Sequence, residues 1–435
     1  MNDKNFNKLN AREECLKSLI NYEKDKKYSN IELSASLEKN NFNELDRGFF
    51  TKLFYGVIEK KFTLDYYIKL LCDKNKKIEN DILNILRMGL YQIVYMDKVP
   101  DNAACNESVE LAKKFKPNNV KIGGFVNAVL RNFIRNREKY EEYVKNADLE
   151  IKYSCSSGII KIWEDSYGFE TAVKLLEESQ SSHGLAITVN SLKIQRDEYL
   201  EKLKNLGIKC EKISEYGVNI LEDLPVRNLY GFDEGLFFVQ DEASQICALE
   251  TGAKSGDLII DCCAAPGGKS FFIGQMIKNN GRIICFDIHE NKINLIKKSA
   301  ERLGVDIIEL YGHDSVNKFK LKDFDLKADV VLCDVPCSGL GVVSKKPEIK
   351  YKTPEEISRL PELQYKILAA CSDYVKPGGT LVYSTCTLNK RENEAVAEKF
   401  LRKNKNFECV SQKTFFPFER KIDGFFLAKL KRIGV

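Results

Sequence analysis

From Gly256 onward, short apolar runs alternate with amphipathic segments, and this alternation limits the possible folds more than any other feature. Continuously apolar strands need both faces covered, which predicts a parallel sheet with crossover helices on each side. We therefore expect a doubly wound α/β domain that binds its ligand beyond the carboxyl ends of the strands. The runs of strand length are DLIIDCC, RIICFDI, DIIELYG, ADVVLCDVP and GGTLVYSTC, and helical spacing is seen in NKINLIKKSAERL and PEEISRLPELQYKILAACSDYV.

The first of these strands runs into the sequence DCCAAPGGKS, residues 261–270, which we interpret as a cofactor loop. Gly267 and Gly268 allow the backbone to approach a ligand closely before a helix begins. This glycine pair matches neither the GxGxxG spacing of dinucleotide-binding folds nor the Walker A spacing. Hydride transfer and nucleotide hydrolysis are therefore disfavoured.

Acidic residues follow the next two strands. Asp287 ends the second strand, where a carboxylate can accept hydrogen bonds from both hydroxyls of an adenosine ribose. Asp314 follows the third strand, where it could meet the rim of the adenine. Helix N-capping is the alternative for either residue.

The fourth and fifth strands deliver thiols. Asp334 and Cys337 follow the fourth strand, and Cys386 follows the fifth. A single cysteine at a strand end is more often an inert packing residue than a nucleophile. Two cysteines at the tips of consecutive strands, beside a cofactor loop, favour a chemical role instead.

The rest of the chain divides into two further regions. Residues 1–140 carry apolar positions at helical spacing and predict an all-α domain. Residues 141–250 combine a helical connector with a strand-helix-strand pattern, which predicts a small α+β module of open role. Residues 251–435 form the α/β domain described above.

Composition indicates the cellular compartment of the chain and the state of its cysteines. The 435 residues are 43% hydrophobic and 30% charged, as in ordinary globular proteins. No stretch approaches the roughly 20 apolar residues of a membrane span, and the start lacks the apolar core of a signal peptide, so we expect a cytoplasmic protein. The 14 cysteines are then reduced thiols. No CxxC or HExxH motif accompanies the 3 histidines, and we expect no metal centre.

A basic stretch, residues 113–139, suits a polyanionic partner such as RNA. The alternative is a solvated helix face. Eight cations oppose one carboxylate, Glu138; they are Lys113, Lys114, Lys116, Lys121, Arg131, Arg135, Arg137 and Lys139.

Three long motifs carry a resemblance to a known family. The runs DCCAAPGGKS, DVPCSGLGVVSKKPEIKY and LVYSTCTLNKRENEA resemble the motif series of RNA cytosine-C5 methyltransferases, whose fold is Rossmann-like, and FVQDEASQ and DGFFLAKL extend the likeness. The first domain, with VPDNAACNESVELAKKF and GGFVNAVLRN, is similar to the NusB antitermination fold, and the middle module to RNA-recognition folds. Ser270, Val335 and Thr387 depart from the usual family residues without removing a reactive group.

The resemblance implies a reaction and a role for each site residue. It implies S-adenosylmethionine as cofactor and 16S rRNA as partner, with the cytosine at position 967 as target and a monomeric enzyme. Cys386 would attack the ring, Cys337 would assist product release, and Asp334 would bind the cytosine. Lys269 would contact the target nucleotide. The pocket for the cofactor would be lined by Cys263, Ala264, Ala265, Pro266, Gly267, Gly268, Lys269, Asp287, Asp314 and Asp334.

Two alternatives remain open at this point. One is a methyltransferase of the same family that acts on another rRNA position or on tRNA. The other is a non-catalytic RNA-binding factor that has kept the fold.

Overall fold

The computed structural model describes residues 11–25, 29–40, 42–73, 77–181, 184–222, 224–317, 327–420 and 422–434. The chain forms two compact units, a helical unit of residues 1–161 with 345–352, and a unit of residues 162–344 with 353–435 that contains both sheets. No helix among the described residues has the length and apolar character needed to cross a membrane.

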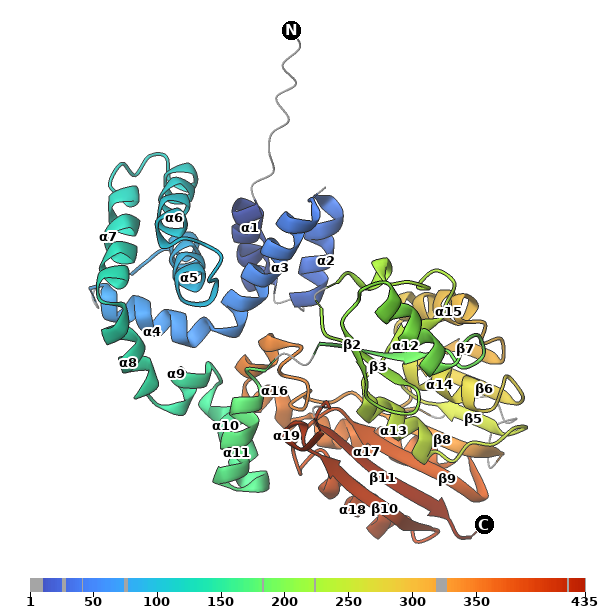
Figure 1. Cartoon of the computed structure of the whole chain (residues 1–435). Coiled ribbons are helices and arrows are strands. Elements are labelled where there is room, and N and C mark those ends of the chain that lie inside the picture. Colours follow the sequence, from blue (N-terminus) through green and yellow to red (C-terminus); the bar gives the residue numbers. More distant parts are fainter. Residues whose placement is uncertain are drawn as a thin grey trace. The chain divides into compact units, whose positions relative to one another are not determined.

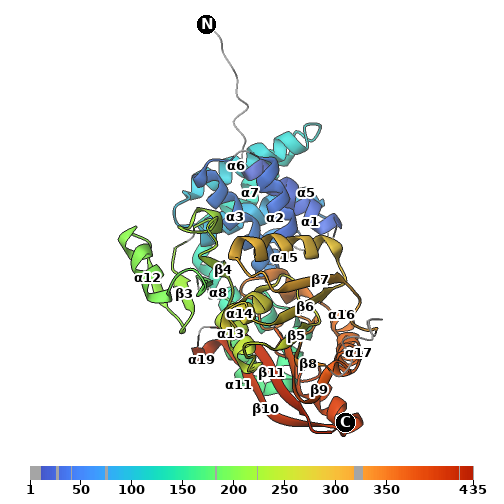
Figure 2. The ribbon, with the colours of Figure 1, turned by 90° about the vertical axis from the view of Figure 1, so that its right-hand side faces the viewer.

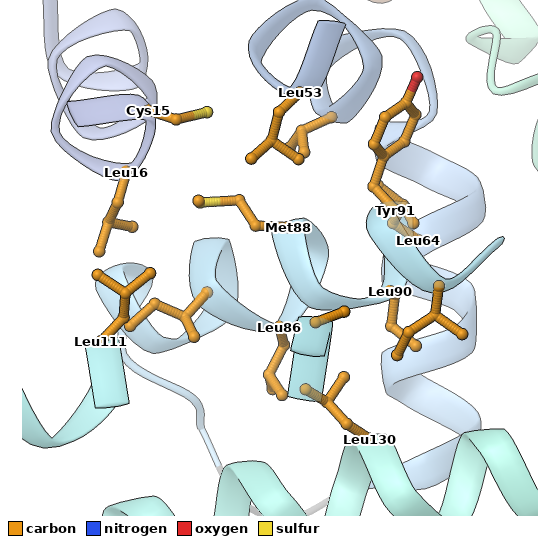
Figure 3. Close-up of a cluster of buried hydrophobic side chains, with 14 of the residues drawn as sticks. Cys15, Leu16, Leu53, Leu64, Leu86, Met88, Leu90, Tyr91, Leu111 and Leu130 are labelled. Atoms are coloured by element: carbon orange, nitrogen blue, oxygen red, sulfur yellow. The ribbon is translucent and has the colours of Figure 1, made fainter. Parts of the chain in front are cut away.

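The helical unit confirms the predicted all-α region. Its centre is the helix α5, which is buried along most of its length because apolar residues lie on several of its sides. Met88 points toward Cys15 and Leu53, and Leu86 points toward Leu130 (Figure 3). The helices are α1 (Ala11–Asp25), α2 (Ser29–Lys39), α3 (Glu44–Glu59), α4 (Lys61–Leu71), α5 (Asn80–Tyr95), α6 (Asp101–Phe115), α7 (Ile122–Arg135), α8 (Arg137–Lys145), α9 (Leu149–Tyr153) and the first part of α10 (Ser157–Tyr167).

A short segment from the second half of the chain also belongs to the helical unit. The 3-10 helix η2 (Pro347–Tyr351) lies in the loop after the fourth predicted strand, and the chain returns to the other unit at Thr353. The hydroxyl of Tyr351 bonds the carbonyls of Ile58 and Glu59 at 2.7 and 2.9 Å. These contacts fix the segment at the end of α3.

The middle module is an antiparallel sheet of order β2-β3-β1-β4 with one long helix, as the strand-helix-strand pattern predicts. Its apolar core joins the strands to Tyr199 and Leu203 of the helix. The elements from the end of the helical unit onward are α11 (Phe169–Glu178), β1 (Leu185–Val189), α12 (Arg196–Asn205), β2 (Cys210–Lys212), β3 (Gly217–Ile220), η1 (Val226–Asn228), β4 (Phe237–Val239) and α13 (Glu242–Glu250).

The large sheet has seven strands in the order β10-β11-β9-β8-β5-β6-β7. Figure 2 shows them in this order, from β7 near the middle of the view to β10 at the bottom. The five strands predicted from the sequence pair in parallel, and the last two, which the periodicity did not reveal, are antiparallel to their neighbours. The strands are β5 (Leu258–Asp261), β6 (Arg282–Asp287), β7 (Ile308–Gly312), β8 (Ala328–Asp334), β9 (Val375–Thr385), β10 (Phe407–Phe415) and β11 (Phe425–Arg432).

Helices cover both faces of this sheet, as continuously apolar strands require. Ile259 belongs to the core under α13, α14 and α15, and its neighbour Ile260 to the core under α17 and α18, because successive strand residues face opposite sides. Figure 1 shows the strands of this sheet in yellow to red. The remaining helices are α14 (Gly268–Met276), α15 (Glu290–Leu303), α16 (Pro354–Ser358), α17 (Leu360–Ser372), α18 (Glu394–Lys403) and α19 (Pro417–Arg420).

The strand order places a switch point between β5 and β8. The chain adds β6 and β7 on one side of β5, then crosses to its other side to form β8 and β9. Loops that leave neighbouring strands at such a point run in opposite directions and open a crevice for a ligand. The motif-bearing loops after β5, β8 and β9 lie along this crevice.

Candidate functional site

The loop after β5 is shaped by a glycine that no other residue can replace without strain. Gly267 has φ of 102° and precedes α14, and a Cβ at this position would lie 2.3 Å from the ring of Phe271. No side chain caps the N-terminus of α14, so its free N–H groups remain available to a ligand. The predicted cofactor loop therefore has the geometry of a binding loop.

A pocket of about 430 Å³ lies against this loop. Gln240 contributes a buried amide whose Nε2 has no hydrogen-bond partner among the described residues, although its Oε1 accepts a bond from Thr188 at 2.8 Å. An unsatisfied buried donor of this kind favours a bound acceptor. The pocket is lined by Val239, Gln240, Ser244, Asp261, Cys263, Ala264, Ala265, Pro266, Gly268, Lys269 and Asp334.

Besides the apolar Val239, three polar lining residues were not assigned a role from the sequence: Gln240, Ser244 and Asp261. The first two belong to the quoted run FVQDEASQ, which was the available signal. Burial raises the pKa of Asp261 to about 7, against the opposing effect of a 2.6 Å hydrogen bond from Ser270. Ser270, which replaces the usual threonine, keeps the hydroxyl needed for this bond.

Asp287 and Asp314 lie at adjacent strand ends, as predicted, but they are not among the residues that line this pocket. The N–H of His313 bonds the carbonyl of Asp287 at 3.0 Å, and the N–H of Ala264 bonds the carbonyl of Phe286 at 2.9 Å. Asp287 is therefore next to the loop. The Asp287 carboxylate accepts the N–H of His289, which is the N-cap of α15, and the Asp314 carboxylate accepts the N–H of Val316 at 3.1 Å. Their contacts with a cofactor remain predictions.

The two predicted thiols meet. The sulfurs of Cys337, after β8, and Cys386, after β9, lie 3.2 Å apart, and both residues are half-buried. Their hydrogen bond and the removal from water raise the pKa of Cys337 well above the usual thiol range. Cys337 therefore keeps its proton and lies against the sulfur of Cys386.

Two of the lining residues, Lys269 and Asp334, form a charged pair. The Lys269 ammonium is 2.6 Å from one oxygen of Asp334, and the hydroxyl of Ser384 donates to the other oxygen at 2.8 Å. Burial lowers the pKa of Lys269, but the attraction of Asp334 outweighs this and leaves the pKa raised. The Lys269 ammonium therefore stays charged, and the hydrogen bonds fix the orientation of the pair from α14, β8 and β9.

Three further thiols form a group that the sequence did not reveal. Cys262, Cys333 and Cys371 are buried with their sulfurs within 4.8 Å of one another. Structural zinc sites use four ligands, and no fourth histidine, cysteine or carboxylate joins this group in the described part of the chain. Because the three residues belong to an apolar cluster, we interpret them as packing residues.

The predicted basic stretch, residues 113–139, contains cations with carboxylate partners and cations without them among the described residues. Lys114 pairs with Glu13 at 2.6 Å, and Lys116 with Glu79 at 2.6 Å; Lys113 and Arg137 also have carboxylate partners. In the described part of the chain, carboxylates do not pair with the other four cations, which are Lys121, Arg131, Arg135 and Lys139.

The sheet order and the site define a class of protein, the S-adenosylmethionine-dependent methyltransferases with a Rossmann-like fold. The 16S rRNA methyltransferase RsmB/F family matches residues 248–431, the NusB family matches residues 9–135, and the RsmF/B-like ferredoxin-like domain matches residues 158–227. The chain belongs to the 16S rRNA methyltransferase RsmB/F family.

Relatives along the whole chain agree with this assignment. The probable ribosomal RNA small subunit methyltransferase B of Bacillus subtilis is 36% identical over 92% of this chain and 90% of its own length. The ribosomal RNA small subunit methyltransferase B of Vibrio vulnificus is 31% identical over 88% of this chain and 91% of its own length.

Solved structures agree in fold. The crystal structure of PH0851 covers 97% of this chain and 99% of its own, with a TM-score of 0.79 at 22% identity. NSun6 from Pyrococcus horikoshii, crystallised with SFG, covers 64% of this chain and 99% of its own, with a TM-score of 0.59 at 24% identity.

Proposed function

We propose that this protein methylates carbon 5 of a cytosine in 16S rRNA, with Cys386 as the nucleophile. The observation that carries the proposal is the pair of thiols 3.2 Å apart, beside Asp334 and Lys269, at the carboxyl edge of the sheet. Carbon 5 of cytosine is a poor nucleophile, so the ring must be activated by covalent addition before it can accept a methyl group. A target base must also leave its stack to reach such a site.

Each thiol has its own step. The Cys386 thiolate forms a bond to carbon 6, which moves electron density to carbon 5 and lets that carbon attack a methyl group. S-adenosylmethionine, when bound, supplies this methyl group as a cation equivalent. Loss of the proton from carbon 5 to water then restores the ring double bond, and the bond between carbon 6 and sulfur breaks to release the Cys386 thiolate. Cys337, whose sulfur lies 3.2 Å from that of Cys386, is placed to assist this release.

Asp334 would select the base. Its carboxylate can hydrogen-bond nitrogen 3 or the amino group of cytosine and stabilise the protonated adduct. The orientation of Asp334 depends on its hydrogen bonds from Lys269 and Ser384. Lys269 would hold the target nucleotide as well.

The pocket against the β5 loop would hold the cofactor. The orphaned Gln240 Nε2 and the uncapped end of α14 provide donors for the ligand, and the glycine at 267 brings the backbone close. Asp287 and Asp314, at the next two strand ends, would bind the ribose and the adenine. The target position and the monomeric state remain predictions from the family resemblance, and the cytoplasmic location remains a prediction from the composition.

Two variants test the assignment of the thiols. Cys386→Ala should abolish methyl transfer to rRNA, because no sulfur remains to attack carbon 6. Cys337→Ala should leave a protein-RNA complex that survives a denaturing gel, because attack proceeds but release fails. Normal methyl transfer by Cys386→Ala would refute the proposed mechanism.

The target can be read separately. Bisulfite sequencing of rRNA from cells with and without the protein reveals the lost mark, since a methyl group on carbon 5 protects cytosine. A lost mark on tRNA or on another rRNA position would replace 16S rRNA position 967 as the substrate, and no lost mark would favour a non-catalytic RNA-binding factor.

A further inference from the structure

A buried carboxylate joins the two loops that carry the thiols. Glu392 is 0% exposed and lies six residues after Cys386, in the run RENEA. One of its oxygens accepts the N–H of Ser338 at 2.8 Å, and the other accepts the Ser338 hydroxyl at 2.5 Å. Ser338 is the residue directly after Cys337. A single carboxylate from the Cys386 loop thus grips the residue next to the other thiol.

Two amide side chains complete the hydrogen bonds to the Glu392 carboxylate. Gln364 donates to one Glu392 oxygen at 2.9 Å and also to the carbonyl of Pro336 at 3.0 Å, and Asn389 donates to the other oxygen at 2.8 Å. Four donors therefore meet the two oxygens, which is about as many hydrogen bonds as a carboxylate accepts. A buried charge is tolerated when its hydrogen bonds are complete in this way.

A chain of hydroxyls extends the connection to Thr387, next to Cys386. The carboxylate can only accept, so the Ser338 hydroxyl donates to Glu392 and receives the Thr387 hydroxyl at 2.6 Å. Thr387 in turn accepts the N–H of Leu340 at 3.1 Å. Each hydroxyl in this series can donate to only one partner. The hydrogen bonds therefore hold the two loops together at Ser338 and Thr387, the residues that follow Cys337 and Cys386.

We propose that Glu392 is the positioning residue of the thiol pair: it latches the Cys337 loop to the Cys386 loop and so sets the separation of the two sulfurs. The consequence for product release rests on the proposed function. The proposed effect on the sulfur spacing does not rest on that function, because the spacing can be measured without RNA or methyl donor.

The spacing is measured by disulfide formation in the whole protein. Diamide takes up the two thiol hydrogen atoms on its N=N bond as the Cys337 and Cys386 sulfurs join, and peptide mass spectrometry follows this disulfide over time. Glu392→Gln replaces one carboxylate oxygen by an NH2 group, which then faces a donor from Asn389 or Ser338 instead of accepting its hydrogen bond. We expect disulfide formation to slow by about tenfold or more. Asp329→Asn is the matched control, since Asp329 accepts the Leu258 N–H at the opposite end of β8 and should leave the rate unchanged.

Reaction with RNA gives a second measurement, the amount of covalent protein-RNA complex, which a general loss of stability would not increase. If Cys337 is displaced from the leaving sulfur, Glu392→Gln should accumulate the covalent protein-RNA complex during turnover, whereas Asp329→Asn should not. Glu392→Asp, which keeps the charge but shortens the reach, should fall between Gln and the natural residue.

The outcomes separate the two proposals. A folded Glu392→Gln protein with the natural rate of disulfide formation would overturn the latch, whatever its methylation activity. A slowed disulfide together with full methyl transfer by Cys386→Ala would support the latch and refute the proposed function.

Discussion

The α/β unit and the helical unit both bury charged side chains, but they use them differently. In the α/β unit, Lys269 pairs with Asp334, and Glu392 has four donors, and these groups lie directly beside the thiols. In the helical unit, Arg87 is held by Asp65 and Glu23 and links helices, far along the sequence from any reactive residue.

Lys350 sharpens the contrast. It is fully buried in the helical unit, its Nζ has no hydrogen-bond partner among the described residues, and the nearest carboxylate, Glu59, is 4.0 Å away. A buried charge without close partners costs stability. The buried charges beside the thiols therefore have close partners. The helical unit holds one buried charge with close partners, Arg87, and one without close partners among the described residues, Lys350. We call the loops that carry Cys337 and Cys386 the reactive edge.

The largest expected effect comes from the close backbone packing of the reactive edge. A Cβ at Gly341 would lie 1.9 Å from the carbonyl oxygen of Gly424 and 2.9 Å from that of Cys386. Gly341→Ala must therefore push the Cys337 loop away from Cys386, and should reduce methyl transfer to rRNA by about 100-fold or more. Transfer of radiolabelled methyl groups measures this.

Gly124→Ala is the matched control in the helical unit. Nothing lies within 4 Å of a Cβ at this position in α7, so activity should be unchanged and the helix slightly stabilised, by about 0.5–1 kcal/mol. Equal activities of the two variants would show that the reactive edge is not held as rigidly as its packing indicates.

The second effect concerns Lys350. Burial lowers its pKa to about 8 from 10.5, so the unfolded chain binds the proton more tightly than the folded one. The loss of folding stability caused by burying the Lys350 charge is complete below about pH 8 and disappears as the pH rises toward 10.5. Lys350→Met should raise the free energy of unfolding at pH 7 by up to about 3 kcal/mol, and by much less at pH 10.

Urea unfolding followed by circular dichroism at the two pH values measures this gain. The exposed Lys52, in α3, provides the control Lys52→Met, which should change stability little at either pH. A gain of the same size at pH 7 and pH 10 would mean that the apolar side chain, and not the lost charge, stabilises the unit.

The smallest effect is expected on the surface of the helical unit. Arg131, Arg135 and Lys139 have no carboxylate partners in the described part of the chain, so changing them to Gln should weaken rRNA binding. The slope of log affinity against log salt should fall by about one per lost phosphate contact. Lys114→Gln with Lys116→Gln should have a smaller effect, since these cations already have partners. Unchanged affinity at low salt in the first variant would identify a solvated face.

The same contrast explains how much the sequence predicted. Cys337, Cys386 and Asp334 were found because parallel strands bring their carboxyl ends to one edge, so local apolar runs suffice to place the residues at their ends. The resemblance, and not periodicity, assigned different steps to the two thiols. The doubly wound α/β fold, the all-α region and the small α+β module were predicted correctly because each shows a periodic pattern of apolar residues.

The features that local patterns missed depend on contacts between distant residues. The pairing of β10 with β11, the packing of Lys350 in the helical unit, and the approach of Ser338 to Glu392 each join segments whose separation in sequence carries no periodic signal. The charge run from Lys113 to Lys139 did not reveal which of its cations have carboxylate partners, because Glu13 and Glu79 come from distant parts of the sequence.

The attack by Cys386 is tested most directly by locating the RNA on the protein. Cys337→Ala is incubated with S-adenosylmethionine and rRNA, the denatured complex is digested with protease and nuclease, and mass spectrometry identifies the modified peptide. We predict a methylated cytosine nucleotide on Cys386. A nucleotide on any other residue, or no covalent complex from a folded protein that binds both substrates, would contradict the assignment.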